Sequence, residues 1–301
     1  MKVYIANNLV DGPYGGGNQF LKFLRDRFRA LSVYSEDPLK ATVVLFNSHQ
    51  NVEEVCNLKN QNSSAIFVHR LDGPMRLYNY MEDTRDLTAY QMNTAFADAV
   101  VFQSHWSKQA NLKLGLAVDT KHSTVIHNAT NKAIFTKNEP KTGQKKVRIV
   151  ASSWSNNVKK GFLTYKFLDK NLDFNKYEFV FMGRSPIEFQ NIVDLGPLEA
   201  KQVAEELRNS NIYITASEND PCSNSLLEAL SSGIPALALK SGGHPELIGS
   251  GGLLYEKENE IINKLQQIWD NYDKYRSGIK TNNIDDVTEE YLSFFKACTN
   301  N

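Results

Sequence analysis

Cysteine is scarce in this chain, neither charge is in surplus, and long apolar runs are missing. The three cysteines, Cys56, Cys222 and Cys298, are too far apart to indicate a disulfide framework or a metal-binding pair, and they suit a reducing compartment. Lysine plus arginine equals aspartate plus glutamate at 34 each, so no global field favours nucleic acid. Composition therefore argues against a secreted disulfide-rich protein and against a nucleic-acid partner.

No apolar run approaches the length that crosses a bilayer, and the first residues enter a strand-like run without a signal peptide. We therefore expect a soluble protein of the cytoplasm, with peripheral association at a membrane left open, as is the oligomeric state. The chain also lacks an Asp-x-Asp motif and any cluster of His, Cys and Asp with the spacing of metal ligands. Neither a cofactor nor a metal is expected.

Apolar runs alternate with helix-like segments along the whole chain, which is typical of parallel sheets covered by helices on both faces. The expected strands are Val3–Ala6, Thr42–Phe46, Ala65–Val68, Ala99–Phe102, Thr124–Ile126, Val147–Ala151, Glu178–Met182, Ile212–Thr215 and Ala236–Leu239. The main expected helices are Asn18–Ala30, Leu77–Phe96, Trp106–Leu114, Asn259–Asn271 and Val287–Ala297. The fold class is therefore α/β.

The length of 301 residues suits two domains of ordinary size. Residues 1–131 form the expected first domain, and residues 132–146, polar and containing Pro140 and Gly143, form the expected linker. Residues 147–282 form the expected second domain, and residues 283–301 an additional helix that packs back on the first. Two Rossmann-like, doubly wound domains facing a cleft should bind ligands outside the carboxyl ends of their strands.

The most informative segment is Ala216–Ala236, which follows an apolar strand with a polar loop and then a helix beginning near Asn224. Free backbone N–H groups at a helix amino terminus, together with the helix dipole, bind phosphate. The residues around this start are Cys222, Ser223, Asn224 and Ser225. Asp220 in the loop and Glu228 in the helix can hold hydroxyls on either side of a phosphate, as in a nucleotide sugar. An ordinary capped helix with one exposed acid is the alternative.

This pattern resembles the signature of the retaining GT-B glycosyltransferases of family four, also called group 1, in which two glutamates are separated by seven residues. Asp220 stands here in place of the first glutamate, and Glu228 matches the second. The resemblance extends from about Met1 to Tyr255 and implies a GT-B fold. It implies transfer of a hexose from a GDP- or UDP-sugar, such as GDP-mannose or UDP-glucose, to a glycan, glycoprotein or lipid acceptor. The anomeric configuration would be retained and no metal required.

The same resemblance assigns further donor-side residues in the second domain. Lys160, before a glycine, would contact the diphosphate, and Ser153 lies in the same loop. Trp154 occupies the position of an arginine in the family, so Lys159 or Arg184 would supply a second cation. Other implied features are the nucleobase loop at Asp194–Glu199 with Leu198 and a sugar-side turn at Lys240–Glu246. A solvated lysine pair is the alternative for Lys159 and Lys160.

Two motifs of the first domain are also candidates. Gly16 and Gly17 belong to a glycine loop, Asp11–Asn18. Its position resembles that of the first-domain glycine loop of GT-B enzymes, which lies against the donor phosphates or the acceptor. The alternative is that these glycines only allow a tight turn of the backbone. His69 follows a strand and can assist a proton transfer or bind a sugar hydroxyl. Arg70 and Asp72 would lie on the acceptor or sugar side, or else pair with each other in a turn.

Other functions are compatible with the same architecture. A sugar-nucleotide epimerase or a phosphorylase shares it, although the spacing of Asp220 and Glu228 and the Lys160 loop favour transfer. A catalytically inactive nucleotide-sugar-binding module is a further alternative, because Asp220 replaces a glutamate and Trp154 an arginine. The catalytic candidates are thus Asp220, Glu228, Lys160 and His69.

Overall fold

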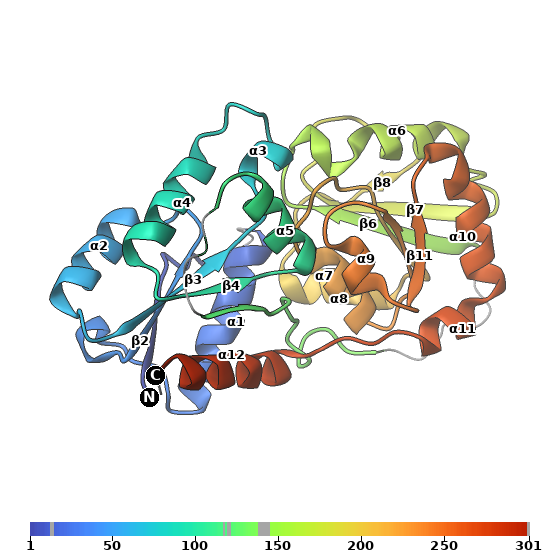
Figure 1. Cartoon of the computed structure of the whole chain (residues 1–301). Helices are drawn as coiled ribbons and strands as arrows, with labels where there is room; N and C mark the ends of the chain where they lie inside the picture. The colour runs from blue at the N-terminus through green and yellow to red at the C-terminus, as the bar shows by residue number, and fades with distance from the viewer. Residues whose placement is uncertain (13–14, 117, 119–121, 138–144, 300–301) are drawn as a thin grey trace. The chain divides into compact units, whose positions relative to one another are not determined.

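The computed structural model describes residues 1–12, 15–116, 118, 122–137 and 145–299. It forms two compact units, each an α/β structure on a parallel sheet (Figure 1). Unit 1 comprises Met1–Val10, Asn18–Asn128 and Asn283–Asn301, and unit 2 comprises Asp11–Gly17 and Ala129–Asn282. The glycine loop, expected with the first domain, is thus grouped with unit 2. Residues 138–144 of the expected linker lie outside the described residues.

The sheet of unit 1 has the order β1-β2-β3-β4-β5 with all neighbours parallel. Its strands are β1 (Val3–Ala6), β2 (Val43–Asn47), β3 (Ile66–Leu71), β4 (Ala99–Phe102) and β5 (His122–Val125). Its helices include α1 (Gly16–Ala30), the 3-10 turn η1 (Pro38–Lys40), α2 (Val52–Gln61), α3 (Met75–Tyr78), α4 (Arg85–Phe96) and α5 (His105–Lys113). The central strands are buried apolar runs because helices cover both of their faces.

The helix α12 (Ile284–Thr299), at the far end of the sequence, completes the core of unit 1. Its aromatic rings pack on α1, with Tyr291 against Phe20 at 6.3 Å and Phe295 against Phe28 at 6.2 Å between ring centroids. Figure 1 shows α12 beside α1, on the side of the sheet opposite α2 and α4. Truncation of this helix would therefore expose the core that α1 covers.

The sheet of unit 2 has the order β11-β10-β9-β6-β7-β8, also with parallel neighbours. Its strands are β6 (Val147–Ser153), β7 (Tyr177–Gly183), β8 (Val193–Asp194), β9 (Ile212–Thr215), β10 (Ala236–Leu239) and β11 (Gly252–Tyr255). Its helices include α6 (Phe162–Asn171), α7 (Ala200–Arg208), α8 (Asn224–Ser231), α9 (His244–Ile248), α10 (Ile261–Asp270) and α11 (Tyr272–Ser277), with 3-10 turns η2 (Val158–Lys160) and η3 (Glu258–Glu260). Because β6 lies between β9 and β7, the strand order reverses there, and ligands of such sheets bind at this switch point.

Two apolar clusters cover the two faces of this sheet. Ile149 and Ala151 contribute to a cluster rich in aromatic rings, among them Tyr165 and Phe181. Val150, between them in sequence, belongs to the other cluster, on the side of α7 and α8. Successive residues of a strand point to opposite faces, so the centre of β6, Ile149–Ala151, is apolar on both faces. This central strand is therefore anchored on both sides, and the loop that follows it starts from a fixed point.

The expected helix over Leu77–Phe96 is wrong, because the segment is divided into α3 and α4. Hydrogen bonds from side chains in the break between α3 and α4, and in α4 itself, stabilise this interruption. Asp86 accepts hydrogen bonds from the backbone N–H groups of Met75 (2.6 Å) and Arg76 (3.0 Å), and Asn79 donates to Asp83. These side-chain hydrogen bonds satisfy the free N–H groups at the start of α3, and they compete with the backbone hydrogen bonds that a single continuous helix would make.

Candidate functional site at the carboxyl edge of unit 2

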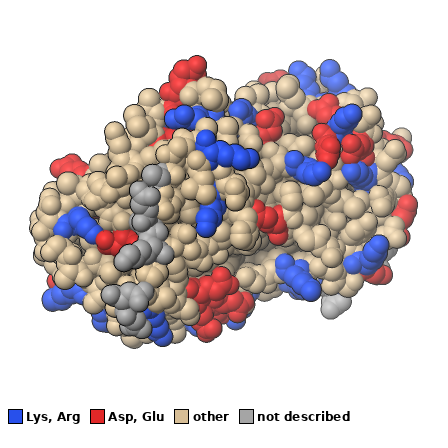
Figure 2. All heavy atoms as spheres, viewed as in Figure 1, with Lys and Arg blue, Asp and Glu red and all other residues tan. Residues whose placement is uncertain are grey.

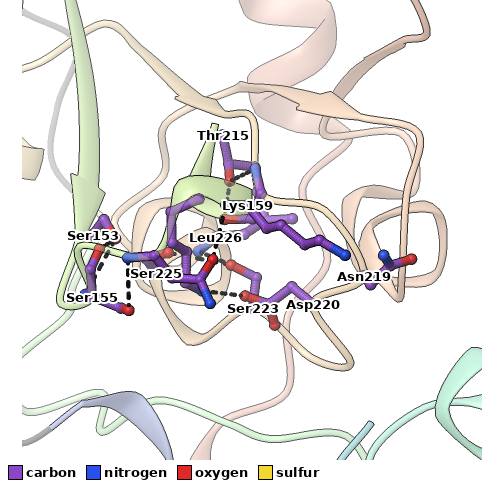
Figure 3. Close-up of polar contacts among 12 residues, drawn as sticks. Ser153, Ser155, Lys159, Thr215, Asn219, Asp220, Ser223, Ser225 and Leu226 are labelled. Carbon is purple, nitrogen blue, oxygen red and sulfur yellow. Dashed lines mark hydrogen bonds and ion pairs between the residues drawn. The ribbon is translucent and has the colours of Figure 1, made fainter. Parts of the chain in front are cut away.

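Polar side chains gather where three neighbouring strands of unit 2 end, and Figure 3 draws those around the ends of β6 and β9 and the start of α8. Lys160 lies in η2 after β6, Asp220 in the loop after β9, and His244 at the start of α9 after β10. Because the strands are parallel and adjacent, their carboxyl ends meet at one edge of the sheet. Residues 60 and 84 positions apart in sequence are therefore brought to the same place, at the switch point of the sheet.

Lys160 and Asp220 form an ion pair at this edge. Their Nζ and Oδ2 atoms are 3.0 Å apart, and the side chains are only 17% and 13% exposed. The close approach depends on Gly161, which has a φ of +87°. A Cβ atom added at this glycine would lie only 2.2 Å from the Cβ of Ala216. A side chain at position 161 would thus push η2 away from the end of β9 and separate the pair.

Asp220 is held ionised by its surroundings. Burial, the largest single influence, raises the pKa of its carboxyl. The charges of Lys160 and His244 and the hydrogen bonds from Lys160 and from the Cys222 backbone N–H together lower it by more. The net pKa lies below the ordinary value of an aspartate. At neutral pH this edge therefore presents a carboxylate beside an ammonium group.

The turn after β10 fixes the backbone of the Asp220 loop. The N–H of Gly243 donates to the carbonyl of Asp220 at 2.8 Å, and the N–H of Asn219 donates to Ser241 Oγ at 2.9 Å. Gly242 has a φ of +60°, and a Cβ there would lie 2.2 Å from the Asp220 carbonyl oxygen. Only glycine allows this approach, so the Gly242–Gly243 pair positions Asp220 through its main chain.

Helix α8 begins directly beside Asp220 and offers an anion-binding amino terminus. Ser223 caps it, with its Oγ accepting from the Leu226 N–H at 3.4 Å and lying 3.2 Å from Ser225 Oγ. Both Cys222 and Ser223 are buried, so the backbone here is better placed than these side chains to reach a ligand. The remaining N–H groups and the positive end of the helix dipole favour an anion.

Glu228 lies one turn into α8 and is partly buried. Burial raises the pKa of its carboxyl to about 8, and within the described residues this carboxyl makes no hydrogen bond or ion pair. It lies within electrostatic range of Tyr213, whose hydroxyl is 3.3 Å from Ser152 Oγ. An acid of this kind gains stabilising hydrogen bonds only if a ligand brings them.

The other donor-side candidates surround the same edge. Ser153 is buried and its Oγ donates to the carbonyl of Ser155 at 2.7 Å, so it shapes the loop after β6. Arg184 is exposed, and its backbone N–H donates to the Ser153 carbonyl at 2.8 Å. Trp154 and Leu198 are half-buried and pack on the cluster beneath α7 and α8. The residue in place of the family arginine thus serves packing.

Of the glycine loop, Gly16 has a specific contact within unit 2. A Cβ added at Gly16 would lie 2.4 Å from Nδ2 of Asn224, at the start of α8, whereas Gly17 has nothing within 4 Å. The backbone at Gly16 therefore lies directly against the amino terminus of α8. Residues 13 and 14 of this loop lie outside the described residues.

The assignment of His69 as a catalytic residue disagrees with the structure. The ring has no exposed surface and stacks on Phe46 with 4.3 Å between centroids. Nε2 lies 2.8 Å from the Ser48 carbonyl, and Asn93 Nδ2 lies 3.1 Å from Nδ1, so both ring nitrogens are occupied. Burial lowers the pKa of His69 to about 3. A neutral, enclosed ring of this kind stabilises unit 1.

Arg70 is likewise enclosed and does not reach a substrate directly. Its guanidinium donates to Asn47 Oδ1 at 2.5 Å and to Asn128 Oδ1 at 2.6 Å, and it pairs with Asp72 at 3.3 Å. Asp72 also accepts from Gln103 and keeps 26% of its side chain exposed. The alternative of an Arg70–Asp72 pair is thus observed, within a buried network at the ends of four strands, and Asp72 alone of the three keeps access to solvent.

The described residues contain no group of three or more His, Cys, Asp or Glu side chains that could hold a metal ion. Among the described helices none is long and apolar enough to cross a bilayer. The residues singled out from the sequence do not include His244, although the sugar-side turn Lys240–Glu246 contains it, and the charge of Asp220 acts on its ring. Its place after a strand and a Gly-Gly pair was the available signal.

Comparison with known proteins places this geometry in context. Residues 144–271, less than half of the chain, match the family described as Glycosyl transferases group 1. A curated relative, uncharacterized protein 356 of Sulfolobus islandicus rod-shaped virus 1, is 24% identical over 230 residues. That alignment covers 62% of this chain and 64% of the relative, so the matched part spans less than two thirds of the relative's length.

Solved structures similar to the whole chain share its fold at low sequence identity. HepE of Anabaena in complex with UDP and glucose superposes with a TM-score of 0.78 at 14% identity, over 99% of this chain and all of that one. Sucrose-phosphate synthase of Thermosynechococcus elongatus superposes with a TM-score of 0.72 at 14% identity, over 99% and 96% of the two chains. The expected GT-B fold is confirmed. Residues 144–271 are similar to the group 1 glycosyltransferases, the family that the sequence motifs also resemble.

Proposed function

We propose that this chain is a retaining, metal-independent glycosyltransferase that moves a hexose from a nucleotide sugar to a hydroxyl group of an acceptor. The observation that carries the proposal is the edge of the unit 2 sheet. There the largely buried Lys160–Asp220 pair lies together with the amino terminus of α8 and with the carboxyl of Glu228, which has no hydrogen-bond partner among the described residues. This arrangement offers positive charge for a diphosphate and carboxyl groups for hydroxyls on both sides of it.

The diphosphate would lie at the amino terminus of α8, with Lys160 turning from Asp220 towards it. A fixed cation stabilises the negative charge that develops as the nucleoside diphosphate leaves, which is the role a metal serves in other enzymes. The helix dipole adds to this stabilisation without reorganising. The proposal of metal independence rests on these positive groups, and Arg184 at the same edge is a candidate for the second cation.

The two acids would divide the donor between them. Glu228, rigid on α8 beside the phosphate site, would bind the ribose hydroxyls. Asp220, in the loop, would lie at the transferred hexose, where its ionised state suits hydrogen bonds from hydroxyl groups. Direct attack of the acceptor hydroxyl on the face from which the diphosphate departs would retain the anomeric configuration.

The donor that we favour is a UDP-sugar, because the structures of HepE contain UDP, UDP-glucose, or UDP and glucose. A GDP-sugar is the second choice. The acceptor is a glycan, glycoprotein or lipid. Lysine and arginine alternate with aspartate and glutamate over the face drawn in Figure 2, in keeping with a partner other than nucleic acid. Cys56, Cys222 and Cys298 form no disulfide in the part of the chain that the structure describes, which suits the cytoplasmic location that we propose.

The test is a calorimetric screen of UDP- and GDP-sugars, followed by an assay of donor hydrolysis and transfer in which NMR records the anomeric configuration of the product. We expect binding of one nucleotide class and release of its diphosphate with retention. Binding without turnover would favour the inactive module, turnover to an epimer the epimerase, and inversion would contradict the retaining mechanism.

A further inference from the structure

His244 is fully buried, and only one of its ring nitrogens has a partner. Nδ1 lies 2.8 Å from the carbonyl oxygen of Leu239, which can only accept, so we assign the proton to Nδ1. Nε2 is enclosed and has no hydrogen-bond partner among the described residues. A buried polar atom without a partner costs about 1–3 kcal/mol, so its presence at this position calls for a functional explanation.

The ring lies on the turn that holds Asp220. The N–H of Gly243, the preceding residue, donates to the Asp220 carbonyl. The charged groups that act on the ring are Asp220, from the loop after β9, and Lys160, from η2. Burial lowers the pKa of His244, Asp220 raises it and Lys160 lowers it, with a net pKa below the ordinary value. His244 is therefore neutral while Lys160 neutralises Asp220.

We propose that His244 is a positioning residue that replaces Lys160 as the cationic partner of Asp220 when Lys160 turns to an anion. One proton from solvent binds to Nε2 in this step, and no covalent bond is made or broken. Before the step, the charges of Lys160, Asp220 and neutral His244 sum to zero. Afterwards the ammonium group faces the anion and the imidazolium faces the carboxylate, so Asp220 stays ionised and oriented.

The identity of the anion as a donor diphosphate rests on the proposed function, but the exchange of partners can be tested without any donor. Lys160→Met removes the ammonium group and keeps the side-chain stem, which imitates the departure of Lys160 from Asp220. Lys240→Met is the matched control, because Lys240 is exposed, lies four residues before His244 and pairs with Glu256 at 2.6 Å. NMR titration of labelled histidine would report the pKa of His244 in each variant.

We expect the pKa of His244 to rise by about one unit or more in Lys160→Met, which is at least a tenfold gain in proton affinity, and to stay at its wild-type value in Lys240→Met. Signals are assigned with His244→Asn, whose amide can still donate to the Leu239 carbonyl but cannot take up a proton. An unchanged pKa in Lys160→Met, or an equal rise in both lysine variants, would overturn the proposal.

A second experiment links the exchange to ligand binding. Calorimetric titration of UDP in buffers of different ionisation enthalpy gives the number of protons taken up, and the wild type should take up more than His244→Asn, by up to one proton. Comparing the two proteins cancels protons exchanged at other groups, including Glu228. Equal proton uptake contradicts the role of His244, whereas failure of the wild type to bind any nucleotide contradicts the proposed function and leaves the lysine experiment as the test of the pair.

Discussion

At the end of β3 in unit 1, His69 and Arg70 lie in a dense network of hydrogen bonds without exposed surface. At the ends of β6 and β9 in unit 2, Lys160 and Asp220 pair with each other and keep some access to solvent. The side-chain carboxyl of Glu228 makes no hydrogen bond to any residue that the structure describes. Both groups of polar residues follow buried strands, and both suggested a site from sequence alone. They differ in how far the protein itself satisfies them. Among the described residues, Arg70 Nε is the one nitrogen of these two side chains without a hydrogen-bond partner, whereas the whole carboxyl of Glu228 has none.

This difference separates stability from binding. A buried polar network with its partners in place gains nothing from a ligand, and loss of one member leaves the others unpaired. The Lys160–Asp220 pair, by contrast, is partly accessible and lies at a helix amino terminus, near a carboxyl without a hydrogen-bond partner among the described residues. It can exchange its internal contacts for contacts to a ligand. Substitutions in unit 1 should therefore act on folding, and those in unit 2 on ligand affinity.

The largest effect is expected for Arg70→Met. Removing one partner of a buried ion pair costs about 3–5 kcal/mol of unfolding free energy, and here Asn47 and Asn128 also lose their donor. Urea unfolding followed by a probe in unit 1 would measure this. Arg29→Met is the control, because Arg29 and its partner Glu36 are exposed and should contribute little. If Arg70→Met unfolds at the wild-type urea concentration but binds the acceptor more weakly, Arg70 belongs to a binding site and not to a stabilising network.

A smaller effect, confined to ligand binding, is expected for Lys160→Ala. Loss of a charge-assisted contact to diphosphate costs about 1.5–3 kcal/mol, or roughly ten- to hundredfold in donor affinity, with turnover falling as well. Isothermal titration of UDP-glucose and of UDP would measure it against Lys176→Ala, an exposed lysine that bonds Gln266. If affinity does not change, Arg184 becomes the better candidate for the cation.

The pH dependence of binding should identify Glu228 as a ribose ligand. Burial raises its pKa to about 8, and hydrogen bonds from hydroxyls favour the ionised form, so binding below pH 8 releases a proton. The ratio of wild-type to Glu228→Gln affinity for UDP should therefore increase from pH 6 to pH 8, by at most about tenfold per unit, and then level off. A ratio that is flat over this range would remove Glu228 from the binding site.

The smallest effect is expected from removing divalent cations. With Lys160 and the α8 terminus holding the diphosphate, excess chelator should change the affinity for UDP-glucose by less than about twofold. Titrations with chelator and with added magnesium or manganese would measure this. Strong dependence on a metal would show that the unit 2 edge needs a further cation.

Much of the fold could be predicted from apolar runs alone. The bounds of β1, β4, β9 and β10 agree with the expected strands, because these short runs are buried on both faces. Helix α2 was missed since only Val55 and Leu58 of its residues are buried, which leaves a weak apolar period. The break between α3 and α4 depends on side-chain contacts that no periodicity records.

The site was predictable only in part. Asp220, Glu228 and Lys160 were found because a strand, a polar loop and a helix start leave a local signature. The enclosure of His69 and Arg70 could not be read locally, since their partners Asn93 and Asn128 come from distant segments. For the same reason only the structure shows that Nε2 of His244 has no hydrogen-bond partner among the described residues.

The most direct test of the unit 2 edge as a nucleotide-sugar site is a set of four affinities, for UDP and UDP-glucose against Asp220→Asn and Glu228→Gln. Glu228→Gln should weaken both ligands, by about 1.5–3 kcal/mol, because both contain the ribose. Asp220→Asn should leave UDP nearly unchanged and weaken UDP-glucose by a similar amount, because only the donor carries the hexose. If both variants bind both ligands as the wild type does, or lose both equally, the assignment of the two acids to the two ends of the donor is wrong.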